Sequence, residues 1–196
     1  MLFRSASTIL ARYLIILTAG LLQLGAALAL GMTFPEHPLG ILVAFSLVAF
    51  AFIGLGLVIA TLADNVPAVQ ALGQCIFLPM LIIGGVAVRL AALPDWAQHV
   101  SAFFPGRYAV EAIQGCVNGP GLGGLRFSLL ALVLTGFAGC VAGARLFRWD
   151  AQQRFARLPG KIWLLPALAA WLAVGLLAEI RGSVAVSADA EPAAPA

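Results

Sequence analysis

The sequence predicts an all-α fold: a polytopic α-helical membrane protein with about five transmembrane helices and a re-entrant extracellular helical hairpin. Its 196 residues are 62% hydrophobic and 10% charged, with a mean hydropathy of +1.04, whereas soluble domains carry roughly a quarter charged residues. The apolar stretches lack strict alternation, which excludes an outer-membrane barrel. The charge-free stretches, each near the ~20 residues that span a bilayer, are residues 13–35, 38–63, 66–88, 127–144 and 162–178.

Residues 1–12 form an amphipathic segment in front of the first span. Serine is suited to cap a short helix, and apolar positions between two arginines give the segment an apolar face. We expect it to lie on the membrane surface rather than to cross the bilayer. The residues that define it are Arg4, Ser5, Ile9, Leu10 and Arg12.

The first span is expected over about residues 13–32 and the second over about 39–62. Pro35 and Pro38 separate them, and two prolines within four residues stop a helix. This connection contains no Lys or Arg, which favours the outer side of the membrane. The second span contains two small residues that favour close packing in lipid, Gly54 and Gly56.

A tight turn with Asp64 and Asn65 leads into the third span, over about residues 68–88. By alternation this turn lies on the cytoplasmic side. The third span contains residues that loosen the backbone hydrogen-bond ladder, which a membrane tolerates only where neighbours or water satisfy the freed groups. They are Pro79, Gly84 and Gly85.

The stretch from 89 to 126 has mixed polarity and contains two predicted short helices, 94–103 and 108–117, hinged at Pro105–Gly106. About 30 residues are too few for two full spans, so we expect a hairpin that dips into the outer leaflet. Trp96 and Tyr108 are interpreted as interfacial residues. The residues expected to matter here are Pro94, Trp96, Pro105, Tyr108 and Glu111.

The basic residues predict which side of the membrane each loop occupies. Residues 1–12 and 145–161 hold seven of the eleven Lys and Arg residues, so both are expected in the cytoplasm. The hairpin and the C-terminal tail then lie outside. The cluster lacks the interleaved aromatic residues of a nucleic-acid-binding face, so no nucleic acid is expected as a partner. The cluster is Arg145, Arg148, Arg154, Arg157 and Lys161.

These features divide the chain into regions. The tail is small, acidic and rich in Pro and Ala, which is typical of disorder. The predicted regions are an amphipathic segment at 1–12, a transmembrane core at 13–150 that contains the hairpin 89–126, a basic loop with an extra transmembrane helix at 151–181, and a disordered tail at 182–196.

The residues offer no catalytic, metal or cofactor site. No GxxxxGK[ST] loop is present, and the three cysteines have no metal or redox spacing. Asp95 and His99 are four residues apart but lack a third ligand nearby, which favours an interfacial helix face. Glu111 is an intramembrane acid and therefore a candidate functional residue. Pairing with Arg107, four residues earlier, explains it equally well.

A series of short motifs follows in order over about fifty residues: Ala-Val-Gln-Ala at 68–71, Leu-Pro at 78–79, a Gly pair at 84–85, Leu-Pro-Asp-Trp at 93–96, Phe-Pro at 104–105 and Tyr-Ala-Val-Glu-Ala at 108–112. This order resembles the membrane subunit of type-2 ABC transporters, the exporter permeases. The likeness covers about residues 5–148 and corresponds to the C-terminal four spans of the family core.

The resemblance implies a membrane-spanning permease in the bacterial cytoplasmic membrane. Residues 1–12 would be a coupling helix that docks on a separate ATPase, and the turn at 64–70 a second contact. The third span would line a path between two permease protomers, and the hairpin would close that path outside. The implied partners are two ATPase subunits, a second protomer of the same or a different chain, and membrane lipid.

The sequence also departs from the family core. That core has six spans, whereas by the resemblance the first predicted span of this chain is expected to correspond to the third of the core, and a further span is predicted at 162–178. Many relatives carry a basic residue where this chain has Gln114. A non-transporting membrane scaffold therefore remains the alternative hypothesis, while an intramembrane enzyme would need a polar cluster that the sequence does not supply.

Overall fold

The computed structural model describes residues 2–62, 65–146 and 164–181, and within them it contains helices and no strand. The side chains of residues 2–12, 144–146 and 164 lie outside the described part. The helices are α1 (Leu2–Ala29), α2 (Pro38–Leu62), α3 (Val66–Ile83), a 3₁₀ turn η1 (Leu90–Ala92), α4 (Asp95–Ser101), α5 (Pro105–Val117), α6 (Arg126–Leu146) and α7 (Leu164–Ile180). The predicted all-α class is confirmed.

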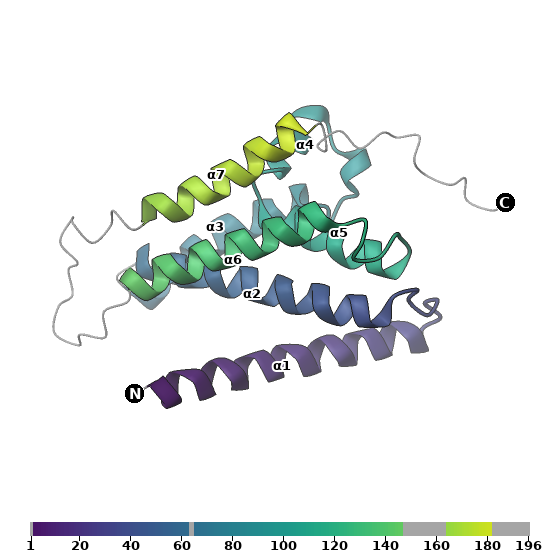
Figure 1. Cartoon of the computed structure of the whole chain (residues 1–196), viewed down its shortest axis with the longest axis horizontal. Coiled ribbons are helices and arrows are strands. Elements are labelled where there is room, and N and C mark those ends of the chain that lie inside the picture. The colour runs from purple at the N-terminus through teal and green to yellow at the C-terminus, as the bar shows by residue number, and fades with distance from the viewer. Residues whose placement is uncertain (1, 63–64, 147–163, 182–196) are drawn as a thin grey trace.

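Among the described residues, three helices are long and apolar enough to cross a membrane: α2, α3 and the 126–143 part of α6. The apolar part of α1, Tyr13–Ala29, and that of α7, Leu165–Ile180, are shorter. The fold is therefore that of a polytopic membrane protein. Figure 1 shows α1, α2, α6 and α7 running along the long axis of the molecule, with α4 beside the C-terminal end of α7.

The N-terminal segment differs from the prediction. The sequence predicts a separate surface helix at 1–12, whereas α1 runs without a break from Leu2 to Ala29. The reason is local: no Pro or Gly interrupts the chain before Gly20, so nothing breaks the hydrogen-bond ladder. Residues 2–12 and the first apolar stretch therefore belong to one continuous helix.

Two element boundaries also differ from the prediction. The bend of the hairpin lies over residues 102–104, and Pro105 opens α5 instead of forming the hinge. Proline suits a first helical position because its missing N–H has no intrahelical partner there. α3 ends at Ile83, earlier than the predicted 88, because Gly85 turns the chain with φ of +87°, a conformation that favours glycine.

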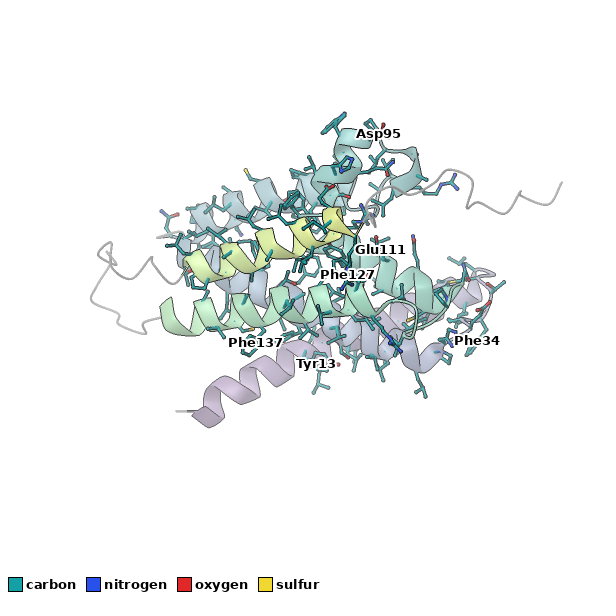
Figure 2. All side chains as sticks on the ribbon, turned by 45° about the horizontal axis from the view of Figure 1, so that its top comes forward. Tyr13, Phe34, Asp95, Glu111, Phe127 and Phe137 are labelled. Atoms are coloured by element: carbon teal, nitrogen blue, oxygen red, sulfur yellow. The ribbon has the colours of Figure 1, made fainter. Side chains whose placement is uncertain are left out.

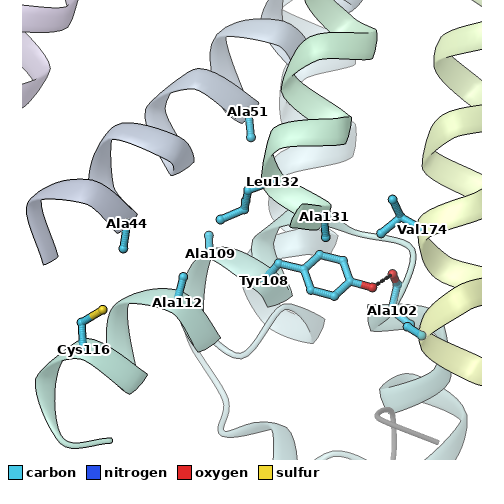
Figure 3. Packing of buried hydrophobic residues seen from close by; sticks show 11 residues of the cluster. Ala44, Ala51, Ala102, Tyr108, Ala109, Ala112, Cys116, Ala131, Leu132 and Val174 are labelled. Carbon is cyan, nitrogen blue, oxygen red and sulfur yellow. Dashed lines mark hydrogen bonds between the residues drawn. The ribbon is translucent and has the colours of Figure 1, made fainter. Parts of the chain in front are cut away.

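The core lies where α2, α5 and α6 meet, and most of its buried residues are small. Figure 3 shows Ala44 and Ala51 of α2 facing Ala109 of α5 and Leu132 of α6. Small residues allow the helix backbones to approach closely. The resulting van der Waals contacts hold helices together in lipid, where the hydrophobic effect does not drive helix association. This packing positions α5, and with it the hairpin, against the two long helices.

Candidate functional site: the outer hairpin

The turn of the hairpin, residues 102–104, is held by hydrogen bonds within the hairpin. Tyr108 is buried and its hydroxyl donates a hydrogen bond of 2.6 Å to the carbonyl of Ala102, drawn in Figure 3. The backbone N–H of Phe104 donates to the carbonyl of Ser101 at 2.9 Å. The interpretation of Tyr108 as an interfacial residue is therefore wrong, because its hydroxyl finds a partner inside the fold. Trp96, by contrast, is 67% exposed.

Arg107 is the buried cation at the base of the hairpin, with 2% of its surface exposed. Its Nε donates to Glu111 Oε1 at 2.8 Å, and its Nη1 donates to Ser101 Oγ at 2.9 Å and to the carbonyl of Gln98 at 3.1 Å. A buried charge is tolerated only when it is paired and hydrogen-bonded. The guanidinium meets that condition and joins α4 to α5.

Glu111 extends this network to a third helix. Its second carboxylate oxygen accepts a hydrogen bond of 2.7 Å from Ser128 Oγ on α6, and Figure 2 shows its place between these helices. The pairing with Arg107, one of the two interpretations of Glu111, is present in the structure, and a functional role of Glu111 stays a prediction. The resulting set, here called the hairpin network, comprises Gln98, Ser101, Arg107, Glu111 and Ser128.

The remaining hairpin and third-span candidates form the junction of α3 with α4 and α5. Pro94 is the residue before α4, and Pro79 lies inside α3. Gly84 lies against α5: a Cβ there would come within 3.3 Å of the Gly106 carbonyl carbon. A Cβ at Gly106 would in turn come within 2.6 Å of Met80 Cγ. The glycines at this junction therefore permit close packing.

An apolar cavity of about 390 Å³ lies beside this junction, between α2, α3 and α5. Gln114 is the polar side chain among its lining residues, and Gly85 is the predicted gate residue that lines it. Such a cavity accommodates apolar groups and provides no groups for chemistry. Further lining residues are Phe52, Phe77, Met80, Gly106 and Val110.

The residues predicted to couple to an ATPase are placed only in part. Arg4, Ser5, Ile9, Leu10 and Arg12 lie on α1, but their side chains are outside the described part, and so is Asp64. Asn65 caps α3, since its Oδ1 accepts a hydrogen bond of 2.8 Å from the N–H of Ala68. Such a cap contributes about 0.5–2 kcal/mol, which gives Asn65 a structural role.

The described residues contain no group of three His, Cys, Asp or Glu side chains that could hold a metal ion. His99 pairs with Glu179 of α7, with Nδ1 2.8 Å from Oε2. The side-chain contacts of the hairpin thus join α4, α5, α6 and α7.

Sequence reasoning missed the central position of Arg107 and the contributions of Gln98, Ser101 and Ser128. The four-residue spacing of Arg107 and Glu111 signals the ion pair, and no signal in the sequence shows which serines complete it. Ser101 and Ser128 reach the pair only through the fold of the hairpin and the packing of α6.

The fold and the hairpin define a multi-pass membrane domain in which Arg107 and Glu111 link α5 to α4 and α6. The chain belongs to the ABC-2 type transporter family, whose sequence pattern matches residues 2–117, more than half of the chain. This is a family of ABC transporter permeases, and the matched region is a membrane domain. Comparisons with curated protein sequences and with solved structures give no match.

Proposed function

We propose that this chain is the membrane-spanning permease subunit of an ATP-driven ABC exporter. It forms the translocation path with a second permease protomer and is coupled to two separate ATPase subunits. The observation that carries the proposal is the exposure of α3, an apolar helix of spanning length of which only Met80 is buried. A helix of this kind needs lipid or another protein along most of its surface.

The polar residues of α3 favour protein over lipid. Gln70 and Gln74 are both exposed and stand one helical turn apart, and Cys75 is exposed beside them. An amide that faces hydrocarbon leaves its hydrogen-bonding groups unsatisfied, which is costly, whereas amides across a helix–helix interface bond to one another. The α3 helix of a second protomer, or of a related chain, supplies such partners.

The cavity and the hairpin fit a path along α3. The cavity lies between α3 and its neighbours α2 and α5, and the hairpin stands at the end of α3 where Gly84 meets Gly106. A passage along α3 would therefore be closed at that end by the hairpin, acting as an outer gate. We assign this gate to Pro79, Gly84, Gly85, Pro94, Trp96, Pro105, Tyr108 and Glu111.

The coupling to ATPase subunits is assigned to residues 1–12 and to the turn at Asp64 and Asn65. With 28 residues, α1 is about 42 Å long. Because α1 is continuous, a push on its N-terminal turns is transmitted as a rigid-body movement. Under this proposal the N-terminus lies in the cytoplasm, the C-terminal tail lies outside, and the protein resides in a bacterial inner membrane.

Photo-crosslinking at α3 tests the protomer interface. In a chain with Cys116→Ala and Cys140→Ala, Cys75 is the thiol to which a benzophenone maleimide attaches. Illumination in native membranes is expected to yield a protein adduct, at twice the chain mass for a homodimer or at another mass for a heterodimer. Labelled Leu130→Cys in a Cys75→Ala background, exposed on α6, serves as the control. Adducts to lipid alone at Cys75 would contradict the proposed interface.

Co-purification tests the coupling. The tagged chain, solubilised from native membranes in mild detergent, is expected to carry bound ATPase subunits and ATP hydrolysis activity. Deletion of residues 2–12 should reduce both to background, while deletion of residues 187–196 should leave both unchanged. Intact ATPase binding after deletion of residues 2–12 would show the coupling assignment to be wrong.

The alternative function is a non-transporting membrane scaffold. It is favoured by the cavity beside α3, whose lining is apolar except for the side chain of Gln114. The two functions differ in one measurement. A permease complex reconstituted in liposomes hydrolyses ATP faster when its cargo is added, whereas a scaffold shows no such stimulation with any candidate cargo.

A further inference from the structure

The last described helix, α7, lies beyond the stretch that the family pattern matches, which ends at residue 117. It nevertheless packs against α6 and reaches the hairpin, as Figure 1 shows for its C-terminal end and α4. The matched residues do not include this helix, and its contacts indicate its role.

The first set of contacts is apolar and tight. Val174 and Ala178 are buried in the same core cluster as Ala102 and Tyr108 of the hairpin turn. Gly175 lies directly beneath Phe103, so that a Cβ at this position would overlap the Phe103 ring. Interiors packed this closely transmit displacement instead of absorbing it. The hairpin turn is therefore closely packed against α7.

The second set of contacts is polar and lies at the C-terminal end of α7. The carboxylate of Glu179 contacts the imidazole ring of His99 on α4, with Oε2 2.8 Å from Nδ1. The Arg181 guanidinium carbon lies 5.2 Å from the centroid of the Phe127 ring, within cation–π range. That ring in turn meets Tyr108 edge-on, with centroids 5.8 Å apart.

We infer that α7 is a brace that fixes the hairpin α4–α5 to α6, so that these four helices move as one body. The hairpin network fastens α5 to α6 through Glu111 and Ser128, and α7 fastens the turn and α4 from the other side. His99 and Glu179 have side chains that are 56% and 30% exposed, and exposed pairs contribute little to stability. The apolar contacts therefore hold the brace, and the His99–Glu179 contact sets the register of α4 on α7.

Hydrogen–deuterium exchange on the full chain in lipid nanodiscs tests the brace. Gly175→Val is expected to raise amide exchange in residues 95–101 about tenfold, since local protection follows the stability of local contacts. Ala173→Val adds similar bulk to an exposed position of the same helix and is expected to leave exchange in α4 unchanged. This readout requires neither ATP nor a partner, so its outcome is independent of the transport proposal.

The contact of His99 with Glu179 provides a second variant that leaves the packing intact. Glu179→Lys brings two basic side chains together and is expected to raise exchange in α4 several-fold. Adding His99→Glu reverses the pair and should restore protection, which a merely structural defect would not show. Unchanged exchange in α4 in both Gly175→Val and Glu179→Lys overturns the brace. A uniform rise over all helices overturns it as well, because it would show general destabilisation.

Discussion

Replacing Arg107 by alanine is expected to lower the stability of the protein by about 1–3 kcal/mol, the typical effect of leaving a buried hydrogen-bonding group without its partner. The side chain is 2% exposed and donates to Glu111, Ser101 and the carbonyl of Gln98. Its loss removes one donor from each of these acceptors and, with it, the side-chain hydrogen bonds by which Arg107 of α5 holds α4. The measurement is the midpoint of thermal unfolding of the purified chain in detergent.

Two companion variants separate charge from geometry. Arg107→Lys keeps the charge but lacks the planar fork of donors, so its unfolding midpoint should fall between those of the native chain and Arg107→Ala. Replacing both partners, with Arg107→Met and Glu111→Leu, removes the charges together and should recover part of the loss. Arg126→Ala, at an exposed position of α6, is the control. An Arg107→Ala midpoint equal to that of this control would refute the role of the network.

Replacing Gly54 by alanine is expected to destabilise the crossing of α2 and α6 by about 1–3 kcal/mol, the usual effect of overpacking a close-packed site. A Cβ at Gly54 would lie 2.6 Å from the carbonyl oxygen of Gly136. A Cβ at Gly139 would lie 2.5 Å from the carbonyl carbon of Gly54. Backbone lies on both sides of this contact, so no side chain can rotate away and the two helices must separate.

Gly56 is the matched control because it lies on the same helix, where a Cβ would meet nothing within 4 Å. Gly56→Ala should stabilise the chain by about 0.5–1 kcal/mol, since alanine loses less backbone entropy than glycine in a helix. Unfolding by sodium dodecyl sulfate titration of both variants measures the difference. Shifts of the same sign for Gly54→Ala and Gly56→Ala would show that α2 and α6 do not depend on this contact.

The hairpin shows how far sequence reasoning reaches. Its existence and its two helices follow from Pro94 and Pro105 and from the rise in polarity after the third span. The ion pair of Arg107 with Glu111 follows from their spacing on one helix. The burial of Tyr108 does not follow, because an aromatic residue with a hydroxyl suits a membrane interface as well as a core with one acceptor.

Helix α1 shows where prediction from the sequence fails. Two arginines and a capping serine favour a separate surface helix at residues 1–12, yet α1 is continuous because no residue ends it before Gly20. Polarity indicates where a segment prefers to lie, whereas a helix ends where a breaking residue or a cap interrupts its hydrogen-bond ladder. A change of polarity along the chain therefore does not by itself mark a new element.

By itself the sequence determines the class of this protein. Charge-free stretches of spanning length specify apolar helices, because a backbone in lipid must satisfy its own hydrogen bonds, and the order of the Pro, Gly and Trp motifs specifies the ABC-2 family. The tertiary structure decides which distant residues meet. Glu111 reaches Ser128 across 17 positions and His99 reaches Glu179 across 80. Such contacts depend on how closely helices cross, and that closeness is set by small residues such as Gly54 and Gly175 that have a role only once a partner helix is in place.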